Sequence, residues 1–288
     1  MDLAVGFDFS VWHPHLDVWL AMLALGAGYV AALRYWGPAH ATPERPAATR
    51  AQKLLFAAGL GVMWLGADWP IHDISEDFLF SIHMTQHTLF SLVAPPLMLL
   101  GTPSWVFRRL FRPKPVAAIV RFFTKPFIAL ILFNGVILVT HWPELVDLSL
   151  RYEAVHFVVH LVLVLTSFAM WWPVIGPLPE MGSMSAPAKM LYLFLQSILP
   201  TVPASFLTFA STPIYEFYAE VPRLWGLDVV TDQRIAGLIM KLGGGLLLWL
   251  AIAILFFRWS AREEGPEPIE EISWDDFEHE LEAWNMRK

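Results

Sequence analysis

AVHFVVHLVLVLTSFAMWWP, residues 154–173, is a run of twenty residues without a single Asp, Glu, Lys or Arg. A helix needs about 20 mostly apolar residues to cross the hydrocarbon core of a bilayer, so this stretch predicts a membrane-spanning helix. Six further predominantly apolar stretches lie on either side of it, over residues 17–35, 53–70, 80–100, 126–143, 188–210 and 234–257. The chain is therefore predicted to be all-α, an integral membrane bundle of seven transmembrane helices.

Composition supports lipid as the surrounding solvent. Hydrophobic residues make up 56% of the 288-residue chain and charged residues only 16%, whereas soluble domains carry about 25% charged residues. The chain contains no cysteine, which excludes disulfides and thiolate metal sites.

The connections between the apolar stretches alternate in charge. Residues 101–125 contain six Lys or Arg and no acidic residue, whereas the N-terminal segment and the alternate connections are acidic. Lys and Arg accumulate on the cytoplasmic side, which predicts the N-terminus outside and the C-terminus in the cytoplasm. We expect three parts: an outer segment (1–16), the transmembrane domain (17–258) and a cytoplasmic acidic tail (259–288). In the tail, residues 269–285 could form a short amphipathic helix or remain a loose extension.

This orientation places most of the histidines at one end of the bundle. Eight of the ten fall on the predicted outer side: His13, His15, His72, His83, His87, His141, His156 and His160. His83 and His87 are four residues apart, as are His156 and His160, and this spacing puts both imidazoles of a pair on one helical face. Four helices thus direct imidazoles toward one layer.

Ionisable side chains at membrane depth are costly and are functional candidates by default. Neutral imidazoles bind Cu, Zn, Fe or Ni, and without cysteine the softer ligands for Cu⁺ are His and Met. Two opposed histidines would also suffice to hold a haem, although six near one layer exceed that need. The spacing is equally compatible with histidines that only hydrogen-bond across helices.

Several motifs carry a family resemblance. They are HMTQH (83–87), VAPPL (93–97), LGTP (100–103), WWPVIGP (171–177), PIYEFY (213–218), WGL (225–227), and DQ (232–233) with AGLIM (236–240). Together and in this order, over about residues 50–258, they resemble the CtaG family, the polytopic bacterial assembly factors of cytochrome c oxidase. Lys241 departs from the pattern, since an apolar or aromatic residue is expected after Met240.

The resemblance implies a multi-pass protein of the bacterial inner membrane that is not an enzyme and that helps supply copper to a haem-copper oxidase. Expected partners are oxidase subunits or other copper-delivery proteins, and the lipid bilayer, but not nucleic acid. On this hypothesis the primary copper ligands are His83, His87, His156 and His160, with His72 and His141 as secondary ligands and Asp232, Met240, Met84 and Asp73 as auxiliary residues. Asp232, at the outer start of the last span, is expected to orient an imidazole.

Two other functions are compatible with the histidine layer. The first is a membrane redox protein that binds haem through two histidines. The second is a copper permease, which is disfavoured because the inner halves of the predicted spans nearly lack His, Asp and Glu.

Overall fold

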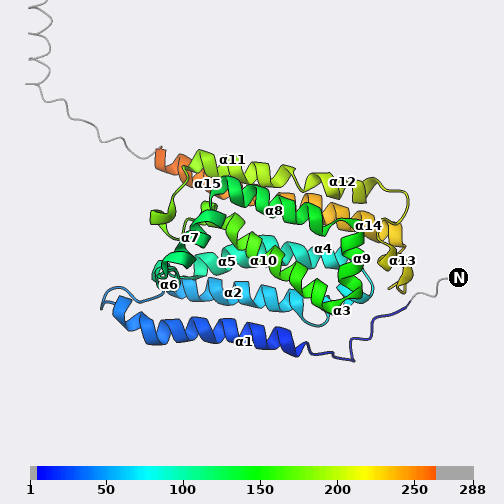
Figure 1. The fold of residues 1–288 in the computed structure, drawn as a ribbon, viewed down its shortest axis with the longest axis horizontal. Helices are drawn as coiled ribbons and strands as arrows, with labels where there is room; N and C mark the ends of the chain where they lie inside the picture. The colour runs from blue at the N-terminus through cyan, green and yellow to red at the C-terminus, as the bar shows by residue number, and fades with distance from the viewer. Residues whose placement is uncertain (1–4, 264–288) are drawn as a thin grey trace, which may run out of the picture.

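The computed structural model describes residues 5–263, and these residues form a bundle of helices without any β-strand (Figure 1). The helices are α1 (Leu16–Ala31), α2 (Arg50–Ala67), α3 (Ile71–Asp77), α4 (Phe80–Thr88), α5 (Ala94–Gly101), α6 (Ser104–Leu110), α7 (Lys114–Phe123), α8 (Pro126–Thr140), α9 (Pro143–Arg151), α10 (Glu153–Ile175), α11 (Ala186–Ile198), α12 (Thr201–Phe209), α13 (Glu216–Glu220), α14 (Val229–Leu238) and α15 (Gly244–Glu263). The predicted all-α class is confirmed, and the predicted tail helix over 269–285 lies outside the described residues.

Every apolar stretch predicted from the sequence overlaps a long helix or a bent helix pair. Five helical segments are long and apolar enough to cross a membrane: Leu16–His40, Arg50–Asp77, Glu153–Ile175, Ala186–Phe209 and Val229–Glu263. Two further candidates are pairs bent by 95° (Phe80–Gly101 with Ser104–Leu110) and 71° (Lys114–Phe123 with Pro126–Thr140). The described residues therefore contain five candidate spans, or up to seven if each bent pair is one span, and the count of seven stays a prediction.

The third predicted span, which holds α4 and α5, is irregular in the middle. A π-helical turn, Leu89–Val93, joins the two helices and precedes Pro95. Proline has no N–H and cannot bond to the carbonyl four residues earlier, which here belongs to Ser91. The indole Nε1–H of Trp171 on α10 donates to that carbonyl instead, at 3.0 Å. The irregular turn is thus joined to α10, the helix that carries the second histidine pair.

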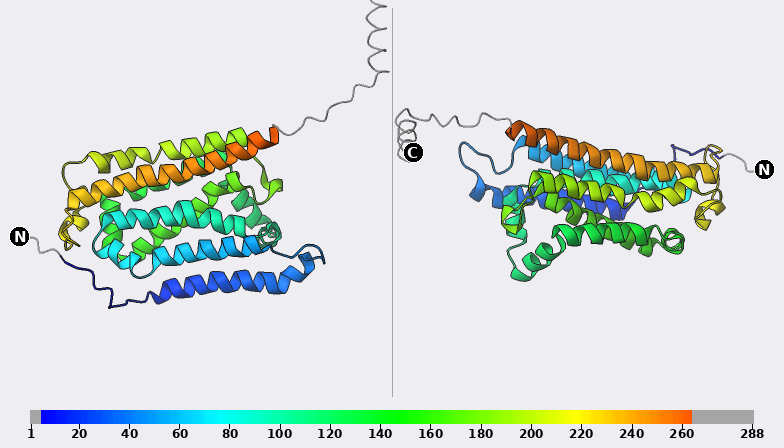
Figure 2. Two further views of the ribbon diagram at one scale, coloured as in Figure 1. Left: turned by 180° about the vertical axis from the view of Figure 1, so that it is seen from behind. Right: turned by 90° about the horizontal axis from the view of Figure 1, so that it is seen from above.

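Helices α2 and α5 pack at very short range through small residues. A Cβ atom added to Gly101 would lie 2.7 Å from Cα of Phe56 and 2.8 Å from the carbonyl oxygen of Gln52. Small residues permit such close contact between membrane helices. The two helices run side by side, with α1 on the other side of α2 (Figure 2).

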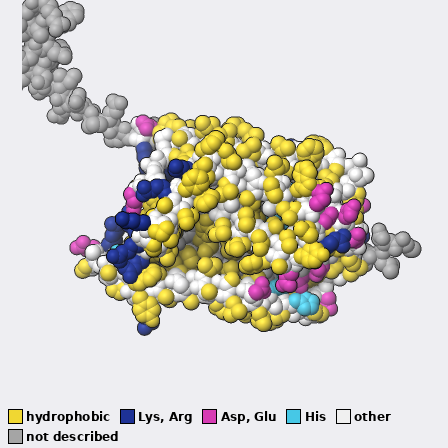
Figure 3. All heavy atoms as spheres, in the orientation of Figure 1, with side chains coloured by type: hydrophobic (Ala, Val, Ile, Leu, Met, Phe, Trp, Pro, Cys, Tyr) yellow, Lys and Arg dark blue, Asp and Glu magenta, His cyan; other side chains and the backbone are white. Residues whose placement is uncertain are grey.

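The two ends of the bundle differ in charge. Lys and Arg gather at the end that holds α6 and α7, which we call the basic end (Figure 3). Asp, Glu and His gather at the opposite end, which holds α3, α9 and α13 and which we call the acidic end. The charge separation expected from the connections is therefore present, while the assignment of the acidic end to the outside stays a prediction.

Candidate metal centre

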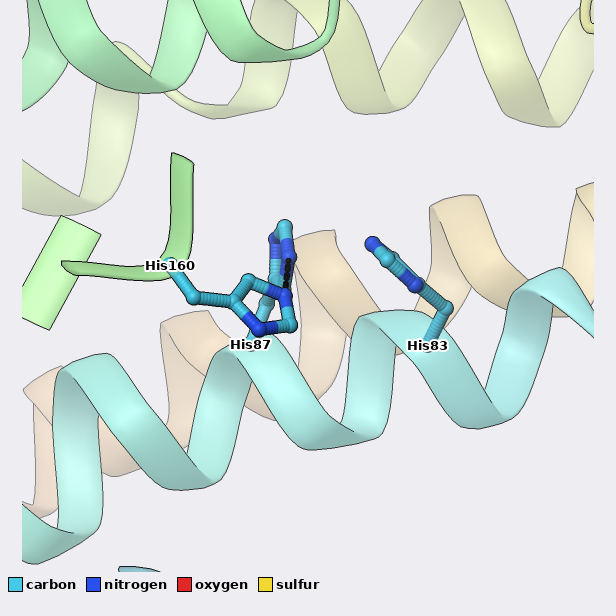
Figure 4. A group of neighbouring side chains, drawn as sticks. All are labelled: His83, His87 and His160. Atoms are coloured by element: carbon cyan, nitrogen blue, oxygen red, sulfur yellow. Dashed lines mark hydrogen bonds between the residues drawn. The ribbon is translucent and has the colours of Figure 1, made fainter. Parts of the chain in front are cut away.

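Three histidines converge inside the bundle near its acidic end. His83 and His87 on α4 and His160 on α10 each offer one ring nitrogen, and these nitrogens lie within 4.8 Å of one another. Nε2 of His87 lies 3.0 Å from Nε2 of His160, and His83 is one turn away along α4 (Figure 4). We call these three residues the histidine triad. Three of the four predicted primary ligands thus form one group.

Asp232 fixes the start of the helix that carries two of these histidines. Its carboxylate is 1% exposed and accepts the backbone N–H groups of Phe80 at 2.8 Å and Ser81 at 3.1 Å. The first N–H groups of a helix lack partners within the helix, and Leu79, which precedes α4, has no side chain that could accept them. The expected contact between Asp232 and an imidazole is therefore wrong. Asp232 positions His83 and His87 through the backbone of α4.

His156, the fourth predicted primary ligand, lies beside the triad and has a different partner. Its Nδ1 lies 2.7 Å from Oε1 of Glu76, and the same oxygen lies 3.0 Å from Nε2 of His72. Both contacts are at ion-pair distance, although neither has the geometry of a regular hydrogen bond. The His156 ring centre is 4.1 Å from that of His160 and 5.6 Å from that of His83. His72 and His156, which share Glu76, therefore form a second histidine group beside the triad.

His141 and Met84 form a pair of soft donors on the other side of the triad. Nδ1 of His141 donates to the carbonyl of Ile137 at 2.7 Å, which leaves the lone pair of a neutral ring on Nε2. That Nε2 lies 3.3 Å from Sδ of Met84. The two residues line a cavity of about 50 Å³ together with His87 and Met240. The predicted auxiliary residues Met84 and Met240 are thus close to the triad.

Asp73, the remaining predicted auxiliary residue, faces the N-terminal segment rather than the triad. Its two oxygens accept from His13 and His15, at 2.9 and 2.8 Å. Asp73 and Glu76 lie three residues apart on α3. Each of these carboxylates contacts two imidazoles.

Several nitrogens of the site have no partner within the described residues. Nδ1 of His83, Nδ1 of His87 and Nε2 of His156 are buried without a hydrogen bond. Most buried polar atoms in proteins are satisfied, and exceptions often mark an ion or a functional role. Neutral imidazole nitrogens without a hydrogen-bond partner keep a site that can bind a metal ion.

A family model described as cytochrome c oxidase caa3 assembly factor (CtaG) matches residues 7–262. The chain belongs to this family. The match confirms the resemblance seen in the motifs of residues 50–258 and extends it toward both ends. No solved structure matches the CtaG chain.

Curated relatives of this CtaG chain come from mycobacteria. Uncharacterized proteins of Mycobacterium bovis and Mycobacterium tuberculosis are each 24% identical over 300 residues, which cover 96% of this chain and 44% of the relative. An uncharacterized protein of Mycobacterium leprae is 24% identical over 277 residues, or 88% of this chain and 40% of the relative. The chain therefore spans less than half the length of these relatives.

The sequence did not identify Glu76 as a residue of the site in this CtaG chain. Glu76 follows His72 by four residues, the same spacing that singled out the histidine pairs. That spacing could have been extended from His–His pairs to His–Glu pairs.

Proposed function

We propose that this CtaG protein is a non-catalytic assembly factor that binds copper at the histidine triad and helps deliver it to a haem-copper cytochrome c oxidase. Membership in the cytochrome c oxidase caa3 assembly factor family supports a cytochrome c oxidase as the recipient. One observation supports the site most: His83, His87 and His160 meet in a buried place where two of them keep an unpartnered nitrogen.

The separation of the triad nitrogens suits a small metal ion. Metal–imidazole bonds of about 2.0–2.1 Å place two ligand nitrogens about 3.3 Å apart at a tetrahedral angle. Nε2 of His87 and Nε2 of His160 are 3.0 Å apart, close to that value, and share a hydrogen bond that a bound ion would replace. Met84 and His141 would add a thioether and an imidazole, a donor set that favours copper in a chain without cysteine.

Haem receives less support than copper. The cavity beside His87 and His141 has a volume of about 50 Å³. Sites for ligands of cofactor size occupy about 300–1,000 Å³. A bis-histidine haem would therefore need the helices to separate.

Delivery at one face of the membrane is better supported than passage through it. The buried cluster toward the basic end is apolar and contains Phe107, Trp171 and Leu248. If the acidic end faces outward, as the positive-inside rule predicts, the site opens to the outer side of the bacterial inner membrane. Oxidase subunits or other copper-delivery proteins would then meet the protein there.

Metal analysis of the purified full-length protein tests this function. We expect copper in the wild-type protein after growth with copper, and its loss in the His83→Ala/His87→Ala variant. His40→Ala is the matched control, because His40 stacks on Trp105 at the basic end, with ring centres 4.7 Å apart. Equal copper in the double variant would overturn the site, and a haem absorption band in a copper-free preparation would favour the alternative.

A further inference from the structure

The N-terminal segment lies across the acidic end and is hydrogen-bonded to it at two places. Val5 donates its N–H to the carbonyl of Arg223 at 3.0 Å, and Trp225 donates to the carbonyl of Val5 at 2.9 Å. Farther along, His13 and His15 bind Asp73. Figure 1 shows the described part of this segment, from residue 5 onward, running to α1. These two histidines take no part in the proposed triad.

Both imidazoles are held in the arrangement typical of metal ligands. Nδ1 of His13 and Nε2 of His15 donate to separate oxygens of Asp73, so in the neutral rings the lone pairs lie on the opposite nitrogens. Metal-binding histidines usually donate their other N–H to a carboxylate in this way. The His13 side chain is 65% exposed and that of His15 is 28% exposed. Both rings are therefore accessible from outside the bundle.

A continuous row of imidazoles leads from His13 and His15 at the surface to the triad. The ring centres of His15 and His72 are 4.3 Å apart, and those of His72 and His156 are 6.0 Å apart. His156 is then 4.1 Å from His160, a member of the triad. Within this row, Glu76 lies at ion-pair distance from both His72 and His156, at 3.0 and 2.7 Å.

We propose that His13 and His15, oriented by Asp73, form a copper-capture site on the surface of the acidic end, which passes the ion through His72 and His156 to the triad. This inference rests on the proposed function for its destination. Each step is a ligand exchange: one bond between copper and an imidazole nitrogen forms as another breaks. At His72 the ion binds Nδ1 and displaces the hydrogen bond that Nε2 of Gln86 donates there at 3.3 Å. The oxidation state of copper does not change, and the ring nitrogens that face the carboxylates keep their protons.

Transfer kinetics test the capture site. Full-length protein is mixed with Cu⁺ held by a chromophoric chelator, and the rate of chelator release is followed by stopped flow. His13→Gln/His15→Gln keeps amide N–H groups for Asp73 but removes the imidazole lone pairs. We expect loading about tenfold slower in this variant, on the order of the effects seen when the surroundings of a metal site are altered. The tight copper bound at the triad should be unchanged at the end.

The controls separate this inference from the proposed function. His40→Gln at the basic end should load at the wild-type rate, whereas Asp73→Asn should load slowly, like the double Gln variant. Wild-type loading in His13→Gln/His15→Gln would overturn the capture site even if the triad binds copper.

If tight copper is instead insensitive to His83→Ala/His87→Ala, the proposed function fails. Copper binding at the capture site is then tested separately, by electron paramagnetic resonance of Cu²⁺ added to that variant. Nitrogen coordination that disappears with His13→Gln/His15→Gln supports the capture site, and coordination that persists overturns it.

Discussion

The acidic end and the basic end of the bundle are held together by different forces. The acidic end buries polar side chains, among them His83, and there His156 and Asp232 contact partners on other helices. The basic end relies on apolar contact among residues such as Phe107 and Trp172 and carries its charges on the surface. Ionisable groups inside a membrane protein are costly and are functional candidates by default. The difference indicates that one end maintains the bundle while the other holds the site.

A change in the packing of the basic end should have the largest effect on stability and no effect on the amount of copper bound per folded chain. In Gly101→Ala, the added methyl group meets the backbone of Phe56 and Gln52, so α2 and α5 must separate. We expect a loss of about 1–3 kcal/mol in stability, typical of overpacking. Thermal unfolding measures the loss, and copper per folded chain should stay at the wild-type value. Gly61→Ala on α2 is the control, because nothing lies within 4 Å of its added Cβ.

The opposite pattern is expected from Glu76→Gln at the acidic end. The variant keeps the shape of the side chain but loses the carboxylate that orients His72 and His156. Loss of such an orienting group weakens metal binding by about 10–100-fold, and we expect a decrease of this size in copper affinity by competition with a chelator. Glu180→Gln, which removes the partner of Arg108 at the basic end, should leave the affinity unchanged. Equal affinity in both variants would show that Glu76 has no role in binding.

Asp232→Asn should affect both properties, each to a smaller degree. The amide can accept from one of the two N–H groups at the start of α4, so one is left without a partner. Loss of a helix cap costs about 1 kcal/mol. Because α4 carries His83 and His87, copper affinity should fall together with the unfolding temperature. A change in affinity without a change in stability would contradict the capping role. Asp8→Asn, at an exposed carboxylate bonded only to Ser10, is the control.

The smallest effect is expected from the surface ion pairs, one at each end. Arg108 pairs with Glu180 at 2.7 Å at the basic end, and Arg151 pairs with Glu220 at 2.8 Å at the acidic end. Exposed pairs are screened by water and add little to stability. Arg108→Gln and Arg151→Gln should both unfold at the wild-type temperature. A clear decrease for one of them alone would reveal a difference between the ends that burial does not explain.

Local patterns in the sequence predicted much of the fold and part of the site. Apolar run length located the helices, and the four-residue spacing of His83 and His87 placed both on one face of α4. The partners of Asp232 and His156 could not be predicted in this way. Asp232 contacts a backbone about 150 positions earlier, and that contact depends on how α4 and α14 pack. The π-helical turn at Leu89–Val93 also depends on a distant partner, the indole of Trp171.

Glu76 also bears on which ion the protein would select. Among residues 5–263 it is the only carboxylate within 4.0 Å of the buried imidazoles, which are neutral when they bind a metal. Asp232 is also buried, but its oxygens accept the N–H groups at the start of α4, which leaves Glu76 to balance an ion at the triad. Its single charge would balance a monovalent ion, whereas a divalent ion would leave a net positive charge. Charge without a counterion is costly where water is excluded. If the triad binds copper as proposed, electroneutrality would favour Cu⁺ over Cu²⁺ and Zn²⁺, and competition of Zn²⁺ against Cu⁺ in Glu76→Gln measures how much of that preference the carboxylate provides.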